Sequence, residues 1–598
     1  MKKIFISLAL AAMSFGSAYA AKAFPGAMTV TQADGTQLTI FAHGDEDFNW
    51  YTADDGTILV QEGYNYYIAS IDGDGNLSAT QQLAHNAGER TPQEQALASQ
   101  QAKDLFAVAA ESTTRQHKMQ RISINDKATP AYFPHSGSPK ALVILVQFPD
   151  KKFVSEAPKA VFNYYLNAKD DTPTPADFGQ TIINSNSGSV SQYFYDCSAG
   201  SFTPQFDVVG PVTVSESYTY YGKNSGNSKD VNYKQMVQEA CNLVDDQVDF
   251  STYDSNHDGN ADLVYIIYAG YGESINGNSS DCLWPKTSNA LIGTYDNTQV
   301  RWHGINNELN YYPGREFKTY PTTPRLNGIG LFCHEFSHAL GLPDFYCTTV
   351  AANTDYQCME YWSLMDSGEY TNNGNTPTPY TPWEMEVMGW FSPTLLSNDS
   401  PAQISLKPFD EERKAYKIQN PTDGQYLLLQ NIQNQGWYSK MLGKGLLIYR
   451  IDYPNDKVSA SDKPNNRANV SPAMTIVPAD GELISSYSIK TKEDQTKYLN
   501  SHYGDPFPGT SNKHEIEVFA LNKGVKLSTP LYNIAESEEG IITFDYLKRF
   551  PTAIDQPITS LEDADKRIFT LDGRYMGTDA GKLGKGIYII GKKKVVKP

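Results

Sequence analysis

The sequence of 598 residues has few cysteines, few basic residues relative to acidic ones, and few long apolar runs. Six cysteines are too few for a fold held together mainly by disulfides. Beyond the N-terminus, no run reaches the roughly 18 apolar residues that a membrane span needs, so we expect no transmembrane segment. The excess of 68 Asp and Glu over 49 Lys and Arg argues against a nucleic-acid partner.

Nucleotide-binding patterns are also missing, since we find neither a P-loop nor a dinucleotide-binding glycine pattern. What is present is an ordinary apolar content of 40% with 12% aromatic residues, which argues against wholesale disorder. At roughly 150 residues per domain the length corresponds to about four units. The sequence therefore predicts a large, acidic protein of several domains.

The N-terminus has the pattern of a secretory signal peptide. Two lysines, an apolar run and the small-residue ending Ala18-Tyr19-Ala20 predict a leader over residues 1–20, with cleavage after Ala20. Ala21 would then be the first residue, and without a cysteine there a lipid anchor is not expected. We expect an exported protein, either secreted or attached to the outer cell surface.

Residues 21–135 are predicted to form a β-rich pro-segment and a connector. Short apolar strands alternate with turns at Asp34-Gly35, Asp55-Gly56 and Asp72-Gly73. A polar stretch from about residue 88 to 128 follows and is broken by a proline. A small unit directly behind a leader lies where a pro-segment would, although an accessory β domain that stays attached is an open alternative.

Three further units follow, and together the chain is predicted to be an α+β multi-domain protein. Residues 136–395 begin with the apolar run Ala141–Val146, typical of a strand buried on both faces. This unit holds all six cysteines, of which Cys347 and Cys358 are the first expected pair. Residues 396–548 predict a β-sandwich-like domain without a strong helix, and residues 549–598 predict a compact tail.

The motif His334-Glu335-Phe336-Ser337-His338 carries the most specific chemical signal. On a helix the two histidines lie one turn apart on one face, so both can bind one zinc ion. Glu335 would then lie beside the open zinc position and act as general base. An apolar stripe supports the helix, formed by Ile329, Phe332, Phe336 and Leu340.

The residues after the motif suggest a third ligand. Gly341 can adopt the positive φ that ends a helix and reverses the chain, which would return Asp344 to the metal. Met365 lies in a segment that predicts a tight turn beneath the metal, as in metzincins. Glu360, 22 residues after His338, is the rival third ligand in the other large zincin group. We favour Asp344, because the Gly341 turn would otherwise have no purpose.

A second metal signal is a loop rich in oxygen side chains. Its candidate calcium ligands are Asp254, Asn256, Asp258, Asn260 and Asp262. Tyr265 stands where an EF-hand needs a bidentate Glu, so the loop is not an EF-hand, and the following residues predict a strand. A structural calcium site is expected here, with an Asx-rich turn without metal as the alternative.

These motifs resemble the immune-inhibitor-A family of secreted zinc metallopeptidases. The resemblance covers roughly residues 135–545, and its carrying stretches are 328–346, 362–368, 254–270, 188–211 and 443–450. It implies a metzincin-like catalytic domain with a mixed sheet and an active-site helix, a His-His-Asp zinc site, a pro-segment and structural calcium. The chain departs from the family pattern at Gln430-Asn431-Ile432. Residues 550–598 resemble the C-terminal sorting or attachment segments of exported proteins in Bacteroides-type bacteria, which implies a secretion or attachment machinery as partner.

The expected function is that of a secreted zinc-dependent endopeptidase acting on extracellular proteins or peptides, kept latent by its own pro-segment. The pro-segment has no cysteine, which excludes a cysteine-thiolate latency switch. Tyr370 is a candidate for the oxyanion-stabilising donor. Two alternatives remain open: an exported surface binding protein or adhesin with a vestigial zinc site, and a metal-dependent hydrolase of non-peptide amides.

Overall fold

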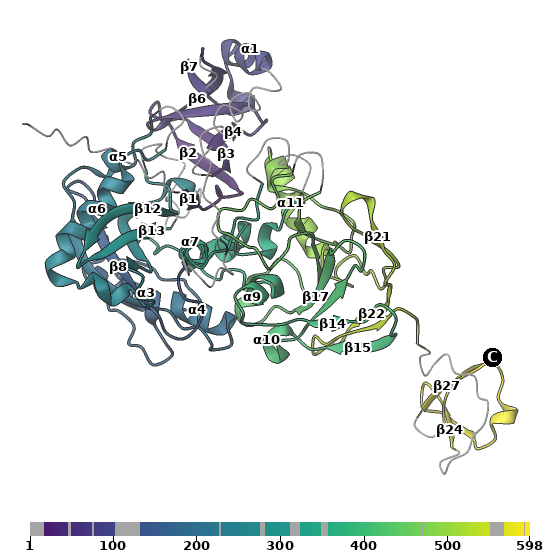
Figure 1. The fold of residues 1–598 in the computed structure, drawn as a ribbon. Helices are drawn as coiled ribbons and strands as arrows, with labels where there is room; N and C mark the ends of the chain where they lie inside the picture. The colour runs from purple at the N-terminus through teal and green to yellow at the C-terminus, as the bar shows by residue number, and fades with distance from the viewer. Residues whose placement is uncertain are drawn as a thin grey trace, which may run out of the picture.

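The computed structural model describes most of the chain in four successive units (Figure 1). The described residues are 17–45, 49–73, 77–101, 123, 132–225, 229–275, 282–310, 323–347, 357–467, 471–550, 567–590 and 593–598, with only the backbone for 17–20. Residues 1–16 of the leader predicted over residues 1–20, most of the predicted connector, and residues 551–566 of the predicted tail lie outside the described residues. Among the described residues, no helix is long and apolar enough to cross a membrane.

The first unit is an antiparallel meander in the order β2-β3-β4-β5-β6-β7. Its strands are β2 (Ala27–Thr31), β3 (Gln37–Gly44), β4 (Asn49–Ala53), β5 (Ile58–Glu62), β6 (Asn65–Ile71) and β7 (Leu77–Leu83). Helix α1 (Pro92–Gln100) follows and begins with a capping box between Thr91 and Glu94. The predicted strands and the turns at Asp34-Gly35 and Asp55-Gly56 are present, whereas the turn at Asp72-Gly73 runs into residues outside the described part of the chain. The apolar face of the meander packs on Trp284 of the next unit.

The second unit is built on a mixed sheet in the order β1-β12-β13-β11-β8-β9. Its strands are β1 (Ser17–Ala20), β8 (Lys140–Gln147), β9 (Gln205–Thr213), β10 (Asn260–Ala261), β11 (Val264–Tyr271), β12 (Lys286–Tyr295) and β13 (Thr298–Leu309). Strands β13, β11, β8 and β9 are parallel, whereas β12 runs antiparallel to β13 and carries β1 on its other edge. The N-terminal segment thus extends the sheet of the unit that follows it.

Helices cover both faces of this sheet (Figure 1). They are α3 (Pro158–Asn167), α4 (Val190–Cys197), α5 (Tyr218–Tyr221), α6 (Tyr233–Val244), α7 (Ile329–Ala339) and α9 (Pro382–Val387). Successive side chains of β8 point to opposite faces, so Val143 packs with α3, α4 and α7 while Ile144 packs with α6. Residues 141–146 are all fully buried, which confirms the predicted strand buried on both faces.

The third unit contains two sheets that share one apolar core. One has the order β14-β16-β17-β18-β19, with β14 (Thr394–Leu396), β16 (Ala415–Gln419), β17 (Tyr426–Ile432), β18 (Gly445–Ile451) and β19 (Met474–Ile476). The other has the order β15-β23-β22, with β15 (Ala402–Leu406), β23 (Ile542–Tyr546) and β22 (Leu531–Glu536). Strands β20 (Phe519–Ala520) and β21 (Lys526–Leu527) form a short separate pair.

The expectation that no strong helix interrupts these strands is wrong, because α11 (Lys492–Gly504) lies between β19 and β20. Short helix α10 (Phe409–Glu412) also occurs in this unit. Helix α11 buries Tyr498 but also Ser501 and His502, so it has little apolar periodicity to detect. The capping box between Thr491 and Asp494 was the available sequence signal.

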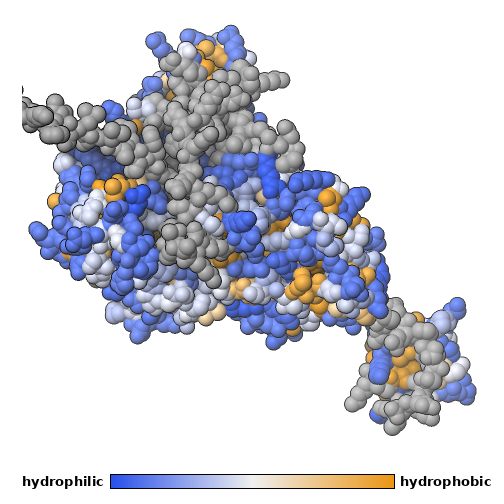
Figure 2. Space-filling model, viewed as in Figure 1, coloured by the Kyte–Doolittle hydropathy of each residue, from blue (hydrophilic) through white to orange (hydrophobic). Residues whose placement is uncertain are grey.

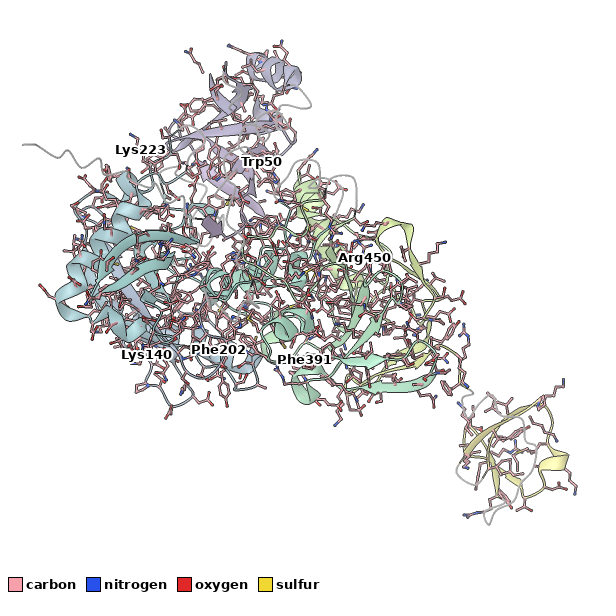
Figure 3. All side chains as sticks on the ribbon, viewed as in Figure 1. Trp50, Lys140, Phe202, Lys223, Phe391 and Arg450 are labelled. Carbon is pink, nitrogen blue, oxygen red and sulfur yellow. The ribbon has the colours of Figure 1, made fainter. Side chains whose placement is uncertain are left out.

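A continuous core joins the second unit to the third. Phe202 of the second unit belongs to a buried cluster that reaches as far as Ile476, and Phe391 packs against the same cluster. Figure 3 shows these two labelled side chains near the junction of the units. The two units therefore support each other, and residues of the third can reach the site carried by the second.

The last unit is a small antiparallel sheet in the order β25-β24-β26-β27, which lies apart from the rest in Figure 1. Its strands are β24 (Ile568–Thr570), β25 (Tyr575–Gly577), β26 (Gly586–Ile590) and β27 (Lys593–Lys597). It exposes Leu571, Met576 and Ile587. Figure 2 shows an apolar area on this unit, whereas hydrophilic residues predominate on the rest of the visible face.

Candidate metal centre and active site

Helix α7 carries the two motif histidines at the centre of the molecule (Figure 1). All its residues from Ile329 to Ala339 are buried. The structure shows why residue 330 is a glycine, which the sequence does not reveal. A Cβ at this position would lie 2.0 Å from the backbone oxygen of Glu369. The glycine lets the helix pack directly on the segment η7 (Ser367–Gly374), which lies just after the predicted Met365 turn.

The structure brings together three donor atoms from His334, His338 and Asp344, all within 4.8 Å of one another. Asp344 Oδ1 lies 3.3 Å from His334 Nε2 and 3.2 Å from His338 Nε2. Donors bound tetrahedrally to zinc at about 2.0–2.1 Å are roughly 3.3 Å apart. The side chains are fully buried, and the spacing and chemistry of the donors therefore fit a zinc ion.

The second nitrogen of each ring fixes its orientation. His334 Nδ1 donates to the Leu364 carbonyl oxygen at 2.9 Å, and His338 Nδ1 donates to the Leu342 carbonyl oxygen at 2.8 Å. Because a carbonyl only accepts, both Nδ1 atoms carry the proton and both Nε2 atoms keep a lone pair for a metal. The rings are therefore arranged as metal ligands.

The chain reversal after α7 occurs as the sequence predicts. Gly341 has φ of +101°, and its backbone N–H donates to the His338 carbonyl oxygen at 2.9 Å. The left-handed conformation is accessible to glycine at no steric cost, which confirms the reason given for this residue. The reversal returns Asp344 to the histidines, and its second carboxylate oxygen accepts a 2.7 Å hydrogen bond from Lys463.

Lys463 comes from the third unit and was not found by sequence reasoning, since no motif marks it. Burial raises the pKa of Asp344, but the positive charge of Lys463 and the interactions with His338 and His334 outweigh it and hold that pKa well below its usual range. Asp344 is thereby kept ionised, which is the form that binds a metal.

A tight turn at Met365 helps to orient the side chains of the metal centre. The Asp366 N–H donates to the Ser363 carbonyl oxygen at 3.2 Å, and Met365 is fully buried. The turn presents the Leu364 carbonyl oxygen that orients His334. The Met365 carbonyl oxygen also accepts a hydrogen bond from the Phe345 N–H at 2.8 Å. This bond connects the turn to the loop that carries Asp344.

Glu335 faces a peptide group of the N-terminal segment. Its Oε1 atom accepts a 2.7 Å hydrogen bond from the backbone N–H of Ala21. The same segment is held by Trp284, whose Nε1 donates to the Ala21 carbonyl oxygen at 2.9 Å, and by Tyr370, whose hydroxyl donates to the Lys22 carbonyl oxygen at 2.5 Å. Burial raises the pKa of Glu335 to about 8, with His334 opposing this rise and Asp344 adding to it.

Glu369 is a second buried carboxylate that sequence reasoning missed. One of its oxygens lies 4.0 Å from His334 Nδ1. Burial raises its pKa well above the usual range, although the nearby His334 works against this.

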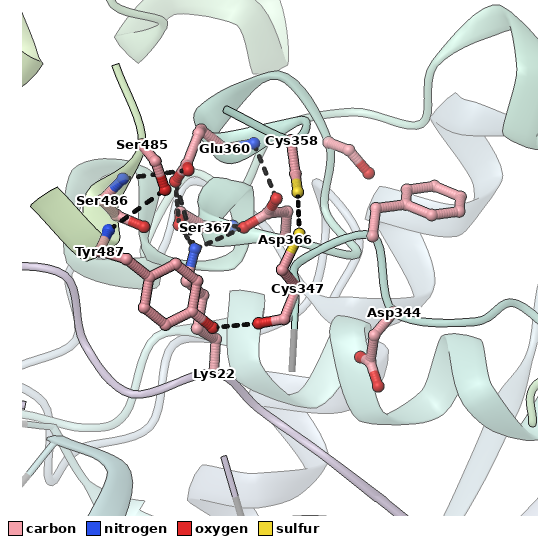
Figure 4. Close-up of polar contacts among 12 residues, drawn as sticks. Lys22, Asp344, Cys347, Cys358, Glu360, Asp366, Ser367, Ser485, Ser486 and Tyr487 are labelled. Carbon is pink, nitrogen blue, oxygen red and sulfur yellow. Dashed lines mark hydrogen bonds and ion pairs between the residues drawn. The ribbon is translucent and has the colours of Figure 1, made fainter. Parts of the chain in front are cut away.

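The rival ligand Glu360 lies in a different cluster. It sits on the short 3-10 segment η6 (Glu360–Trp362), and its Oε2 atom is 3.2 Å from the Lys22 ammonium. Figure 4 shows Asp344 set apart from this group. Among the described residues, Glu360 does not belong to the three-donor cluster.

The loop predicted to bind calcium forms a turn in which several carboxylate oxygens accept hydrogen bonds from the backbone of the loop. Asp254 accepts from the N–H groups of Asp258 and Gly259 at 3.1 and 2.9 Å, and Asp262 accepts from Ser255 at 3.1 Å. Of the described Asp, Glu, His and Cys side chains, only His334, His338 and Asp344 converge as a metal group. The calcium site, with Asn256, Asp258 and Asn260, stays a prediction.

The six cysteines are buried, and the structure joins no two of them by a disulfide bond. Cys347 Sγ and Cys358 Sγ, the expected pair, lie 2.9 Å apart, which is longer than a disulfide bond of about 2.05 Å. Their pairing stays a prediction.

Comparison with known proteins agrees with this geometry. Residues 131–390 match the family model described as the immune inhibitor A peptidase M6 catalytic domain. The chain is 28% identical over 281 residues to the pre-pro-metalloprotease PrtV of Vibrio cholerae serotype O1, which covers 42% of this chain and 29% of that protein. It is 26% identical over 295 residues to immune inhibitor A of Bacillus thuringiensis subsp. alesti, covering 43% of this chain and 40% of that protein.

The matched part of the chain thus spans less than half the length of these relatives. Over that part, the family match and the cluster of His334, His338 and Asp344 point to the same chemistry. Through residues 131–390, the chain matches the immune inhibitor A (M6) family of metallopeptidases.

Proposed function

We propose that the protein is a secreted zinc-dependent endopeptidase whose general base and acid is Glu335. One observation carries the proposal: the backbone nitrogen of Ala21, an amide before leader cleavage and the N-terminal amine after it, lies 2.7 Å from Glu335 Oε1, next in sequence to the metal donor His334. A general base must be within about 2.6–3.2 Å of the group that it serves. The nitrogen of Ala21 therefore occupies the position that the leaving nitrogen of a substrate would take.

The residues divide the work as follows. His334, His338 and Asp344 would hold zinc, which polarises a peptide carbonyl and lowers the pKa of a bound water. Glu335 takes a proton from the attacking water as the C–O bond forms, and then delivers that proton to the leaving nitrogen as the C–N bond breaks. Burial supports this role, because a raised pKa makes the Glu335 carboxylate a stronger base toward the attacking water near neutral pH.

The N-terminal unit would keep the enzyme latent by steric occlusion. Ala21 is fully buried and Lys22 is 3% exposed, so the segment fills the space in front of Glu335. Trp284 and Tyr370 hold both carbonyl groups of this segment. Activation would then require that residues 21 to about 135 leave the catalytic domain.

Export and surface attachment are the other parts of the proposal. The leader pattern over residues 1–20 supports export. The small unit at β24–β27, which lies apart in Figure 1 and exposes apolar side chains, supports a contact with a sorting or attachment machinery.

The test is hydrolysis of a quenched, unfolded protein by the full chain before and after limited proteolysis removes the pro-segment. Wild type, Glu335→Gln and the exposed control Glu482→Gln are compared, each with and without a zinc chelator. We expect activity after processing that chelation and Glu335→Gln abolish and Glu482→Gln leaves intact. Full activity of Glu335→Gln would refute the role of Glu335. Bound zinc without any hydrolysis would favour the adhesin with a vestigial site.

A further inference from the structure

A second buried cluster lies next to the metal centre and is filled by a side chain of the N-terminal segment. We call it the lysine pocket, formed by Glu360, Asp366, Ser367 and the rings of Tyr346 and Tyr487. Glu360, Asp366 and Ser367 are at most 1% exposed. Figure 4 shows the Lys22 ammonium between the two carboxylates.

The ammonium makes three short polar contacts, which equals its number of N–H donors. Lys22 Nζ lies 2.9 Å from Asp366 Oδ1, 3.2 Å from Glu360 Oε2 and 3.2 Å from Ser367 Oγ. The Tyr487 and Tyr346 ring centres lie 5.1 and 5.8 Å away. Burial would lower the pKa of Lys22, but the charges of Asp366 and Glu360 outweigh it and raise that pKa.

The walls of the pocket are held by bonds that do not involve Lys22. The Glu360 N–H donates to Asp366 Oδ2 at 2.8 Å, and the Ser367 N–H donates to Asp366 Oδ1 at 2.8 Å. The Glu360 carboxylate accepts from the Ser486 N–H at 3.1 Å and from the Tyr498 hydroxyl at 2.9 Å. The residues of the pocket therefore belong to the catalytic and third units, and these bonds between them do not require Lys22.

The backbone of Glu360 is consistent with a site under functional constraint. Its φ of +47° lies in the left-handed region, which a glutamate adopts at an energetic cost. The hydrogen bonds to Asp366, Ser486 and Tyr498 keep the residue there. Strain of this kind persists where surrounding contacts over-determine a conformation.

The position of Lys22 relative to Glu335 sets the register. Residues 17–20 run antiparallel along β12, with Ala20 opposite Lys286. Ala21 then presents its nitrogen to Glu335, and Lys22 is the next residue. An extended peptide whose leaving nitrogen contacts Glu335 would therefore place the side chain of its second residue after the scissile bond in the lysine pocket.

Resting on the proposed peptidase function, we propose that the lysine pocket is a substrate subsite that selects lysine as the second residue after the cleaved bond. Lys22 occupies this subsite in the latent chain. Its departure leaves two buried carboxylates without the cation that pairs with both, which is strongly unfavourable. A substrate lysine restores that pairing. Arginine fits less well, because its planar fork does not match three acceptors arranged around one ammonium nitrogen.

The first test varies the peptide and leaves the pocket intact. The full chain after limited proteolysis has removed the pro-segment, which also vacates the pocket, receives quenched peptides that differ only at the second residue after the cleaved bond. These carry lysine, acetyl-lysine, arginine, methionine or glutamate. We expect kcat/KM for lysine to exceed that for methionine or acetyl-lysine on the order of 30-fold or more. Equal values for lysine and acetyl-lysine would overturn the proposal.

The second test changes the pocket. Glu360→Gln should lower the ratio of lysine to methionine kcat/KM at least about tenfold, whereas the exposed control Glu482→Gln should leave the ratio unchanged. An unchanged ratio in a folded, zinc-loaded Glu360→Gln chain would overturn the proposal.

A binding measurement separates this inference from the peptidase proposal. The peptide Ala-Lys-Ala-Phe, which copies residues 21–24, is titrated by calorimetry into the Glu335→Gln chain after an added protease has removed the pro-segment. We expect it to bind at least about tenfold more tightly than its acetyl-lysine analogue. If no substrate is ever cleaved but this difference holds, the peptidase proposal fails and the lysine subsite stands; equal binding overturns the subsite.

Discussion

Two buried acidic clusters are linked to the Met365 turn, and their cations come from different sources. Asp344 in the metal centre is balanced by Lys463 and by the histidines, all outside the N-terminal unit. Glu360 and Asp366 in the lysine pocket are balanced by Lys22, more than 300 residues earlier in the chain. The carboxylates of both clusters are at most 1% exposed, so neither cluster can rely on water to screen its negative charge.

The difference is that the metal centre keeps its positively charged partner, whereas the lysine pocket can exchange its own. The partners of Asp344 stay in place when the N-terminal unit leaves, whereas the partner of Glu360 and Asp366 leaves with it. A buried charge that loses its partner is costly, so the second cluster should take up another cation. We therefore regard the first as the reactive centre and the second as a recognition site.

The largest expected effect is the loss of the metal centre in Asp344→Ala. Zinc content measured by mass spectrometry should fall from about one per chain to near zero, and hydrolysis should fall by about 10⁴-fold or more. Glu360→Ala is the matched control and should retain its zinc. The reverse result, with zinc lost only from Glu360→Ala, would restore Glu360 as the third ligand.

The second effect concerns the exchangeable cation. Lys22→Met in the full chain leaves Glu360 and Asp366 unpaired and should weaken the docking of the N-terminal unit by about 3–5 kcal/mol. We expect faster conversion by an added protease and hydrolysis of small peptides by the unprocessed chain. Lys444→Met is the control, since its ion pair with Glu536 is exposed and contributes about 0–1 kcal/mol. Unchanged latency in Lys22→Met would break the comparison.

A further buried carboxylate lies outside both clusters, and unlike theirs it is paired with backbone N–H groups instead of a cation. Glu308 accepts from the backbone N–H groups of Val154 and Gly270 at 2.7 and 3.2 Å, and burial raises its pKa from 4.5 to about 7. Between these values the unfolded chain has already released the proton that the native state keeps. Stability should therefore fall as pH rises from 4.5 to 7, by roughly 3 kcal/mol for this group.

Urea midpoints of wild type and Glu308→Gln between pH 4.5 and 7.5 measure this contribution. The difference in unfolding free energy, variant minus wild type, should rise with pH across this window. The exposed Glu482→Gln should show no such trend. A difference that is flat with pH would contradict the expected titration of Glu308.

A smaller effect is expected from Lys463→Met, which removes the partner of the outer oxygen of Asp344. Loss of such a supporting contact typically lowers metal affinity about 10–100-fold. Chelator competition measures the zinc dissociation constant, with Lys444→Met as control. An unchanged constant would show that the histidines alone keep Asp344 ionised and oriented.

The smallest effect is expected from calcium at the loop of Asp254 to Asp262. Calcium at about ten times its dissociation constant stabilises by about 1.4 kcal/mol, or an increase in Tm of about 2 °C. Thermal unfolding with calcium or magnesium compares wild type with Asp258→Asn. No calcium-specific shift in wild type would favour the Asx-rich turn without metal.

The elements predicted most directly are those specified by local pattern. The apolar run of β8, the stripe of α7 and the positive φ of Gly341 follow from residues within one or two turns of each other. Helix α11 was missed because tertiary contacts, rather than an apolar stripe, bury Ser501 and His502. The Gly330 contact with Glu369 was equally invisible, since it joins two segments that only folding brings together.

The sequence by itself determined the chemistry of the reactive centre. An H-E-x-x-H helix, a glycine reversal and an aspartate lie within 11 residues, from His334 to Asp344, and helix geometry gives each a direction. Only the tertiary structure decided which charges neutralise which. Lys463 reaches Asp344 and Lys22 reaches Glu360 across the chain, because buried carboxylates require cations that no local pattern specifies.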